Sequence, residues 1–313
     1  MKILVTGGCG YVGTKLVPQL AQKGHDITVL DTQWFGNHLA KIDKVKVILG
    51  DIRNLNALPN ESYEVIIHLA NIANDPAVDL NPTLSWDVNV LAGYGLAEFA
   101  VKCGCRQFIF ASSGSVYGVK EEAEVTEELE LVPISTYNKT KMIAERVYMS
   151  YSEKMKIHCI RPATVCGWSP RMRLDVAVNL LTFQALSKKE ITVLGGSQTR
   201  PNIHIDDMTR VYEHFIQNPT ISSGFYNAGF ENLSIMAIAK MISEKLHANL
   251  IVKPSNDPRS YNQCSDKLIE TGFNPMFGVK DAIGQLIDKY NSNHLTDREE
   301  WHTVKTMKSL NVQ

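Results

Sequence analysis

The sequence of 313 residues lacks an excess of either charge. Lys and Arg total 32 against 33 Asp and Glu, which gives a formal net charge of −1. Such a chain does not offer the broad basic surface with which proteins bind nucleic acid, so we expect no nucleic-acid partner. Any phosphate group must instead be bound by a few local residues.

The sequence also lacks long apolar runs and paired metal ligands. No run approaches the roughly 20 residues of a membrane-spanning helix, so we expect no membrane partner. The opening MKILVTGG enters a strand and a glycine loop rather than a basic and apolar leader. No second Cys or His pair at ligand spacing accompanies the CGC at 103–105, which predicts reduced thiols, no metal site and a cytoplasmic protein.

Short β-branched segments alternate with helical ones in the first half of the chain. Strands are expected at 2–6, 25–31, 44–51, 63–70, 106–113 and 156–162, and helices at 11–24, 82–104 and 135–154. Strands that alternate with helices favour an α/β fold with a doubly wound parallel sheet.

The pattern loosens after residue 167. Helices are expected at 175–189, 205–218, 232–247 and 278–293, a strand at 190–196, and a polar, loosely ordered tail from about 292. We expect a nucleotide-binding domain at 1–167 and a smaller C-terminal α/β substrate domain at 168–313. A strand or helix of the second half is expected to complete the first sheet.

A glycine-rich turn joins the first strand to the first helix. Its glycines have the spacing G-x-x-G-x-x-G, which lets the backbone approach a pyrophosphate at the helix N-terminus. Asp31 closes the next strand, where a carboxylate hydrogen-bonds ribose hydroxyls and repels a 2′-phosphate. The pattern predicts a Rossmann-type domain that binds NAD rather than NADP through Gly7, Gly10, Tyr11, Val12, Gly13 and Asp31.

Two further strand ends are expected to border the dinucleotide. Asp51 and Ile52 follow the third strand, where the adenine is expected, and Leu69 and Ala70 follow the fourth, near the pyrophosphate and ribose. His68 within the fourth strand is expected to pack rather than react.

The segment STYNKTK places Tyr137 and Lys141 one helical turn apart. A phenol has a pKa of about 10, so it needs nearby positive charge to act as a general base at neutral pH. Lys141 and the oxidised nicotinamide ring would both supply it. The upstream serines 112, 113 and 115 are candidates to hold a substrate hydroxyl at the end of the fifth strand.

The motifs together resemble the extended short-chain dehydrogenase/reductase family, in its nucleotide-sugar epimerase/dehydratase branch. They are the glycine turn, Asp31, GDI at 50–52, HLA at 68–70, ASSGSVYG at 111–118, the Y-x-x-x-K pair and RPATVCG at 161–167. The resemblance implies that Tyr137 is the general base, and that Lys141 binds the nicotinamide ribose and lowers the Tyr137 pKa. It implies that Ser113 hydrogen-bonds the reacting hydroxyl, with Ser115 as a further polar contact.

The resemblance also implies a nucleotide-diphosphate sugar as substrate and a homodimer. Arg200, Arg259 and Asn179 match positions of the family's diphosphate clamp, although Pro201 replaces the usual acidic residue after Arg200. The helices at 82–103 and 135–153 would pair with those of a second copy.

The resemblance implies hydride transfer at a sugar hydroxyl, most simply at C4. Family dehydratases carry Asp and Glu where this sequence has Gly114 and Ser115, which disfavours dehydration. A 4-epimerase is favoured, and a C4 dehydrogenase or ketoreductase stays open. A non-catalytic NAD-binding sensor is disfavoured because both Tyr137 and Lys141 are present. The sequence identifies neither the nucleotide nor the sugar.

Overall fold

The computed structural model describes residues 1–39, 41–59, 61–255 and 260–312. Seven parallel strands form its main sheet, in the order β10-β6-β5-β4-β1-β2-β3. The strands are β1 (Lys2–Thr6), β2 (Asp26–Asp31), β3 (Val45–Leu49), β4 (Val65–His68), β5 (Gln107–Ala111), β6 (Lys156–Pro162) and β10 (Gly224–Ala228). The predicted α/β fold with a doubly wound parallel sheet is confirmed.

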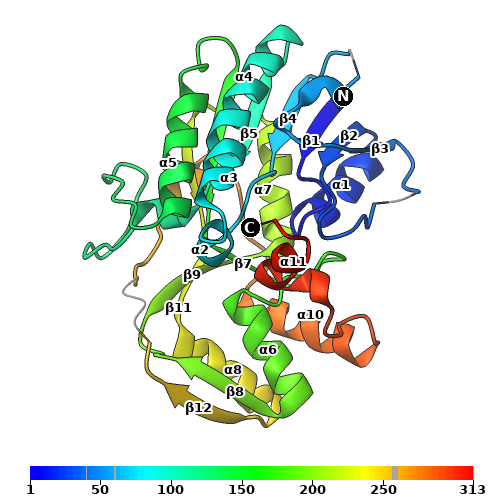
Figure 1. Ribbon diagram of the computed structural model, residues 1–313. Helices are drawn as coiled ribbons and strands as arrows, with labels where there is room; N and C mark the ends of the chain where they lie inside the picture. The colour runs from blue at the N-terminus through cyan, green and yellow to red at the C-terminus, as the bar shows by residue number, and fades with distance from the viewer. Residues whose placement is uncertain (40, 60, 256–259, 313) are drawn as a thin grey trace.

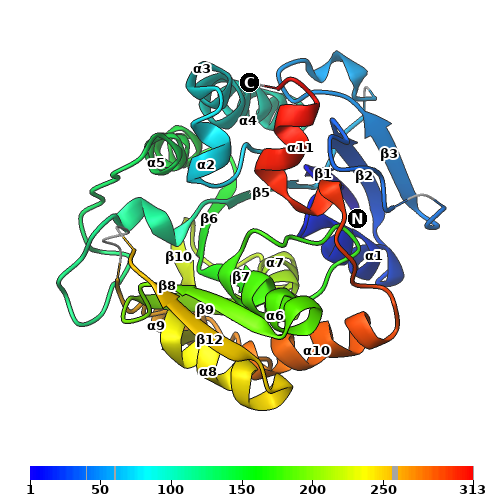
Figure 2. The same ribbon diagram turned by 60° about the horizontal axis from the view of Figure 1, so that its bottom comes forward.

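Helices cover both faces of this sheet (Figure 2). On one face lie α3 (Pro82–Trp86), α4 (Ala92–Lys102) and α5 (Thr136–Met149), and on the other lie α1 (Gly13–Gln22) and α7 (Ile205–Gln217). Because both faces are covered, the central strands are apolar at nearly every position rather than at alternate ones.

The helix predicted at 82–104 is continuous but irregular. A π-helical turn at Asp87–Leu91 joins α3 to α4. At Gly93 the helix approaches α5 so closely that an added Cβ would overlap the hydroxyl of Tyr148. A glycine at this position therefore sets the distance between two helices that cover the sheet.

The second half of the chain builds a smaller set of layers below the sheet (Figure 1). Strands β7 (Thr164–Cys166), β9 (Thr199–His204) and β11 (Glu231–Ser234) form one small sheet, and β8 (Glu190–Leu194) pairs with β12 (Asn249–Lys253). Helices α6 (Ala177–Lys188), α8 (Ile235–Leu246) and α10 (Val279–Asn291) pack around a core of their own. The boundary at residue 167 stays a prediction, while β10 and α7 lie with the first sheet.

The polar tail is more ordered than expected. Helix α11 (Thr303–Ser309), preceded by a short turn at Glu299–Trp301, lies between the sheet and helices α6 and α10 (Figure 1). Trp301 and Met307 are buried in two different apolar clusters, so α11 joins the two halves of the molecule. Trp301 and Met307 are single apolar residues among polar ones, so the sequence shows no apolar periodicity that would predict this packing.

Among the described residues no helix is long and apolar enough to cross a membrane. The six cysteines are free thiols. The predicted cytoplasmic location stays a prediction.

The contact between Gly93 and Tyr148 predicts a specific pattern of stabilities. Gly93→Ala should lower the free energy of unfolding by about 1–3 kcal/mol through overpacking. Adding Tyr148→Phe should restore part of this loss, because the overlapping hydroxyl is buried without a hydrogen-bond partner. Urea denaturation of the single and double variants measures both effects.

Gly95→Ala is the matched control on the same helix, since nothing lies within 4 Å of an added Cβ there. It should stabilise the protein by about 0.5–1 kcal/mol. Equal losses from the two alanine substitutions would contradict the packing argument.

Candidate functional site

A cavity of about 1030 Å³ opens at the carboxyl ends of β1, β2, β4 and β5. Ligands of doubly wound sheets bind in this crevice. Its lining includes most of the residues predicted for the site: Gly7, Gly10, Tyr11, Val12, Gly13, Asp31, Asp51, Ile52, Leu69, Ala70, Ser113, Ser115, Tyr137, Lys141 and Arg200.

The glycine turn packs so closely against neighbouring backbone that side chains would not fit at two of its positions. Gly7 has a φ of +74°, and a Cβ there would overlap the backbone of Ala70. A Cβ at Gly13 would overlap the backbone of Gly8. The turn ends at the start of α1, where the first backbone N–H groups of a helix lack intrahelical partners. This cradle fits the diphosphate of the predicted dinucleotide.

The carboxylate of Asp31 is held at the end of β2. Its oxygens accept hydrogen bonds from the backbone N–H groups of Cys9 at 2.9 Å and Gln33 at 2.7 Å. Burial raises the pKa of Asp31, and these two bonds oppose the rise. Asp51, by contrast, is engaged by the guanidinium of Arg53 at 2.7 Å.

Tyr137 and Lys141 lie on the first turns of α5, which Ser135 caps by accepting a hydrogen bond from the Asn138 backbone N–H. The Lys141 ammonium donates to the Ala111 carbonyl at 2.7 Å and lies 5.9 Å from the centre of the Tyr137 ring. The strand end and the helix thus fix the relative positions of the two side chains.

The pKa of Tyr137 in the protein alone is set mainly by burial. Burial raises it to about 12, and hydrogen bonding to Ser113 and the charge of Arg173 only partly oppose this. Burial also lowers the pKa of Lys141 to about 7, against the charge of Glu145. Desolvation therefore dominates in the protein alone, and a lower Tyr137 pKa requires further positive charge in the cavity.

The three serines of the motif have different surroundings. Ser112 also lines the cavity, but it is buried and its hydroxyl donates a hydrogen bond to Glu145 at 2.6 Å. Ser113 reaches the cavity, where its hydroxyl lies 2.7 Å from that of Ser115. Of this triplet, Ser113 is the one whose hydrogen bonding affects the pKa of Tyr137.

Gly114 lies in a short turn directly before Ser115. A Cβ added at Gly114 would lie 3.1 Å from the side-chain oxygen of Gln263 and 3.2 Å from the Pro162 carbonyl oxygen. The position therefore faces Gln263, and a carboxylate at 114 would require this neighbour to move.

One predicted substrate contact, Asn179, has other partners in the structure. Asn179 is buried and does not line the cavity; its amide donates to the Tyr11 hydroxyl and the Arg173 carbonyl, each at 3.0 Å, and accepts from the Gly167 N–H. It therefore positions Tyr11 instead of contacting substrate. Arg259 lies outside the described residues.

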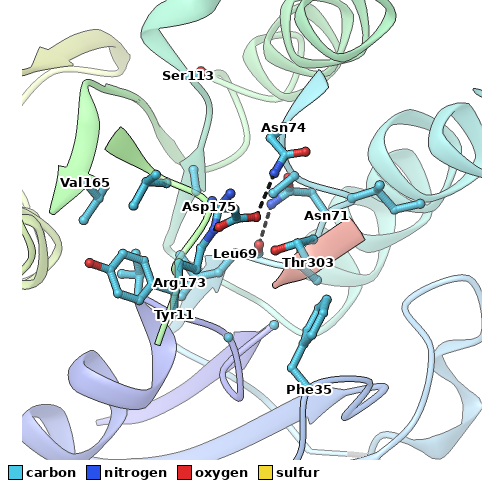
Figure 3. A pocket seen from close by; sticks show the side chains of 18 of the residues that line it. Tyr11, Phe35, Leu69, Asn71, Asn74, Ser113, Val165, Arg173, Asp175 and Thr303 are labelled. Carbon is cyan, nitrogen blue, oxygen red and sulfur yellow. Dashed lines mark hydrogen bonds and ion pairs between the residues drawn. The ribbon is translucent and has the colours of Figure 1, made fainter. Parts of the chain in front are cut away.

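The sequence analysis missed a charged cluster in the middle of the cavity. Arg173 and Asp175 form an ion pair at 2.8 Å, and Asn74 donates to Asp175 at 3.2 Å (Figure 3). The pKa of Asp175 is about 2, because the neighbouring arginine outweighs its burial. The two arginines of the segment PRMRLD at 170–175 were the signal for this cluster.

Comparison with known proteins gives a family match and several relatives. The model of the NAD-dependent epimerase/dehydratase family matches residues 3–229. A UDP-glucose 4-epimerase of Lactobacillus helveticus is 27% identical over 273 residues, covering 78% of this chain and 82% of that protein. UDP-glucuronic acid decarboxylase 1 of Danio rerio is 25% identical, covering 92% and 72%.

Among solved structures, a UDP-glucuronic acid 4-epimerase of Bacillus cereus, in complex with UDP-glucuronic acid and NAD, has a TM-score of 0.81. It is 26% identical, and the match covers 94% of this chain and 100% of that one. Similar proteins thus differ in the reaction for which they are named.

The buried Lys141 predicts how stability depends on pH. Its pKa is about 7 when folded against an ordinary 10.5, so the unfolded chain binds the proton more tightly between these values. Stability should therefore rise with pH from 7 to 9, by up to about 1.4 kcal/mol per unit from this group. Lys141→Met should remove that part of the slope in urea titrations.

Lys139→Met is the control, because Lys139 is exposed on the same helix. Its slope between pH 7 and 9 should equal that of the unchanged protein. The same slope in the Lys141→Met variant would show that Lys141 titrates normally in the folded protein.

Proposed function

This chain belongs to the NAD-dependent epimerase/dehydratase family, and we propose that it interconverts two nucleotide-diphosphate sugars that differ in configuration at C4. The match confirms the family expected from the motifs, and with it an NAD-dependent enzyme. One observation carries the C4 epimerase proposal: Tyr137 and Ser113 meet at the cavity, while positions 114 and 115 carry no carboxylate.

In this proposal the cofactor lies along the cavity between the glycine turn and α5. The backbone of Gly7–Gly13 would hold its diphosphate, and Asp31 the adenosine ribose. Asp51 and Ile52 would border the adenine, and Leu69 and Ala70 the pyrophosphate and ribose. Lys141 would contact the nicotinamide ribose.

Tyr137 is the proposed general base. Its phenol oxygen would accept the proton of the sugar hydroxyl, while the Ser113 hydroxyl holds that oxygen, with Ser115 next to it. NAD, when bound, supplies the hydride acceptor and the positive charge beside this phenol. The pKa of about 12 in the protein alone makes that charge necessary for proton transfer near neutral pH.

The carboxylates of the cavity argue against dehydration. Asp175 is paired with Arg173 and accepts from Asn74, and Asp75 accepts a hydrogen bond from Ser135 at 2.5 Å. Both are thus engaged in holding neighbouring segments. Epimerisation requires no further acid or base beyond the tyrosine, only space in which a keto sugar can turn.

A C4 dehydrogenase or ketoreductase would use the same residues and is the second candidate. Helix α11 favours the epimerase, because Thr303, Val304 and Met307 of this helix line the cavity. An enzyme that exchanges its cofactor in each cycle would have to displace this helix, whereas an epimerase regenerates NAD in place.

The substrate half of the cavity holds Arg200, which we propose as a ligand of the sugar-nucleotide diphosphate. A guanidinium suits phosphate oxygens by its planar fork of donors. Several relatives are named for UDP-sugars, so UDP-sugars are the first substrates to test.

We also propose a homodimer through α4 and α5. These helices pack side by side and leave Leu91, Tyr94 and Ile143 exposed to solvent. A second copy of this helix pair would cover these apolar side chains.

Tyr137→Phe tests the mechanism. It should lower epimerisation by several orders of magnitude, because no other group replaces the phenol oxygen, while NAD binding should stay within a few-fold. NMR of products from UDP-sugars measures inversion at C4, and isothermal titration measures NAD affinity. Tyr290→Phe, on α10, is the control and should be fully active.

Two results would contradict the proposal. Undiminished turnover by Tyr137→Phe would remove the proposed base. Accumulation of a keto sugar with stoichiometric NADH absorbance at 340 nm, and no inverted product, would support the dehydrogenase instead.

Leu91→Glu tests the dimer. Leu91 is 64% exposed, so the substitution leaves the fold of one copy intact but places a charge in the proposed interface. Sedimentation equilibrium should show twice 35.0 kDa for the unchanged protein and 35.0 kDa for the variant. Leu49→Glu, at an equally exposed position on β3, should stay dimeric; a monomeric unchanged protein would exclude the interface.

A further inference from the structure

Arg171 is a buried cation that has no counter-ion in the described part of the chain. It lines the cavity, is only 3% exposed, and its Nε has no hydrogen-bond partner. No carboxylate among the described residues lies within ion-pair distance of it, whereas its neighbour Arg173 is paired with Asp175. Of the two arginines in this segment, Arg173 therefore has a counter-ion among the described residues and Arg171 has none.

An unpaired charge in such a place is unfavourable. Removing a guanidinium from water costs free energy that only an anion or several hydrogen bonds can offset. Burial, reinforced by the charge of Arg173, lowers the pKa of Arg171 to about 9, so the group is still charged at neutral pH. Among the described residues, Asp175 and Asp31 stabilise this charge only from beyond ion-pair distance, so Arg171 can still bind an anion in the cavity.

The backbone places Arg171 at the phosphate-binding turn. The Ser169 hydroxyl donates to the Tyr11 carbonyl at 2.7 Å and lies 2.8 Å from the Thr14 hydroxyl. The Arg171 N–H donates to the same Thr14 hydroxyl at 3.4 Å. Since Thr14 lies in the first turn of α1, the segment is fixed where that helix begins.

The side chain is held from two sides. Its guanidinium stacks on the Phe35 ring at 4.0 Å from the ring centre, and its Nη2 donates to the Thr303 hydroxyl at 3.3 Å. Phe35 follows β2 and Asp31, the predicted adenosine side, and Figure 3 shows Phe35 and Thr303 on the same side of the cavity. The guanidinium is therefore oriented on the cofactor side.

We propose that Arg171 binds the diphosphate of NAD, with Phe35 and Thr303 of α11 holding its guanidinium in place. The second half of the chain thereby contributes the charge that the backbone cradle of the first half lacks. A fork of donors stacked on an aromatic ring suits phosphate oxygens. This inference rests on the NAD dependence of the family and is independent of which sugar reacts.

The diphosphate of the sugar-nucleotide substrate is the alternative ligand for Arg171. The position of Arg171 favours the cofactor diphosphate instead. The Arg171 backbone contacts Thr14 at the start of α1, and its guanidinium stacks on Phe35. The charges of both Asp175 and Asp31 oppose the fall of the Arg171 pKa. Tyr137, at the reaction centre, is affected by Arg173 rather than by Arg171. Arg171 is therefore assigned to the diphosphate of the cofactor, and Arg200 stays the proposed substrate ligand.

The test measures ligand affinity of the full chain freed of bound nucleotide, by isothermal titration with ADP-ribose, adenosine and UDP. Arg171→Gln should weaken ADP-ribose about 10- to 100-fold, the range of a lost charged hydrogen bond. Adenosine and UDP should bind as before, because they do not use this contact. Arg171→Lys should restore part of the affinity, since it keeps the charge but not the fork.

Arg106→Gln is the matched control, an exposed arginine that pairs with Glu64 on the surface. It should leave all three affinities unchanged. The melting temperature of the nucleotide-free protein adds a second readout: Arg171→Gln should leave it unchanged or raise it, because an unpaired buried charge is lost. An arginine with a structural role would lower it.

Unchanged ADP-ribose affinity in Arg171→Gln would overturn the proposal, as would a loss confined to UDP or an equal loss for adenosine and ADP-ribose. If Arg171→Gln does not fold, Thr303→Val removes one of the two groups that hold the guanidinium. It should weaken ADP-ribose several-fold and leave adenosine unchanged, and no difference between the two ligands would overturn the proposal.

Discussion

The hydrogen bond from the Tyr11 hydroxyl to the Gly167 carbonyl, at 2.6 Å, is the contact on which the geometry of the cavity depends. Tyr11 belongs to the glycine turn, yet its ring packs in an apolar cluster with residues of the second half. Asn179 donates to the same hydroxyl at 3.0 Å and accepts from the Gly167 N–H, so three groups fix one another. These contacts of the Tyr11 hydroxyl thereby set the distance between the glycine turn and the second half of the chain.

A second buried group supports the reaction centre from below. Arg161 makes two hydrogen bonds to Glu145, at 2.9 and 2.8 Å, and Glu145 also accepts from Ser112. Glu145 lies one helical turn after Lys141, so this pair locks α5 to the ends of β5 and β6. A fully buried ion pair contributes little net stability but strongly penalises any arrangement that breaks it. The role of the Arg161–Glu145 pair here is to fix the positions of the two adjoining elements that carry Ser113 and Tyr137.

Much of the fold and part of the candidate site could be predicted from the spacing of residues within short segments of the sequence. The strands of the main sheet, the glycine turn and the pairing of Tyr137 with Lys141 follow from spacing along single elements. The pattern could not show contacts between segments far apart in the chain. Asn179 was taken as a substrate ligand, since only the fold reveals that Tyr11 uses its amide. The sequence shows the charges near Tyr137 but not its desolvation, which raises the Tyr137 pKa in the protein alone. Arg171 was missed for the same reason.

The covering of the cavity by α11 has a consequence for biosynthesis. The glycine turn and Asp31 are made well before Thr303 and Met307, which line the same cavity. A chain growing on the ribosome can form the nucleotide cradle early, yet it completes the cavity wall only after residues 299–309 have emerged. Binding of the cofactor in the complete cavity is therefore a late event in the maturation of this protein. Substitutions in residues 299–309 would affect a site that consists mainly of residues made earlier.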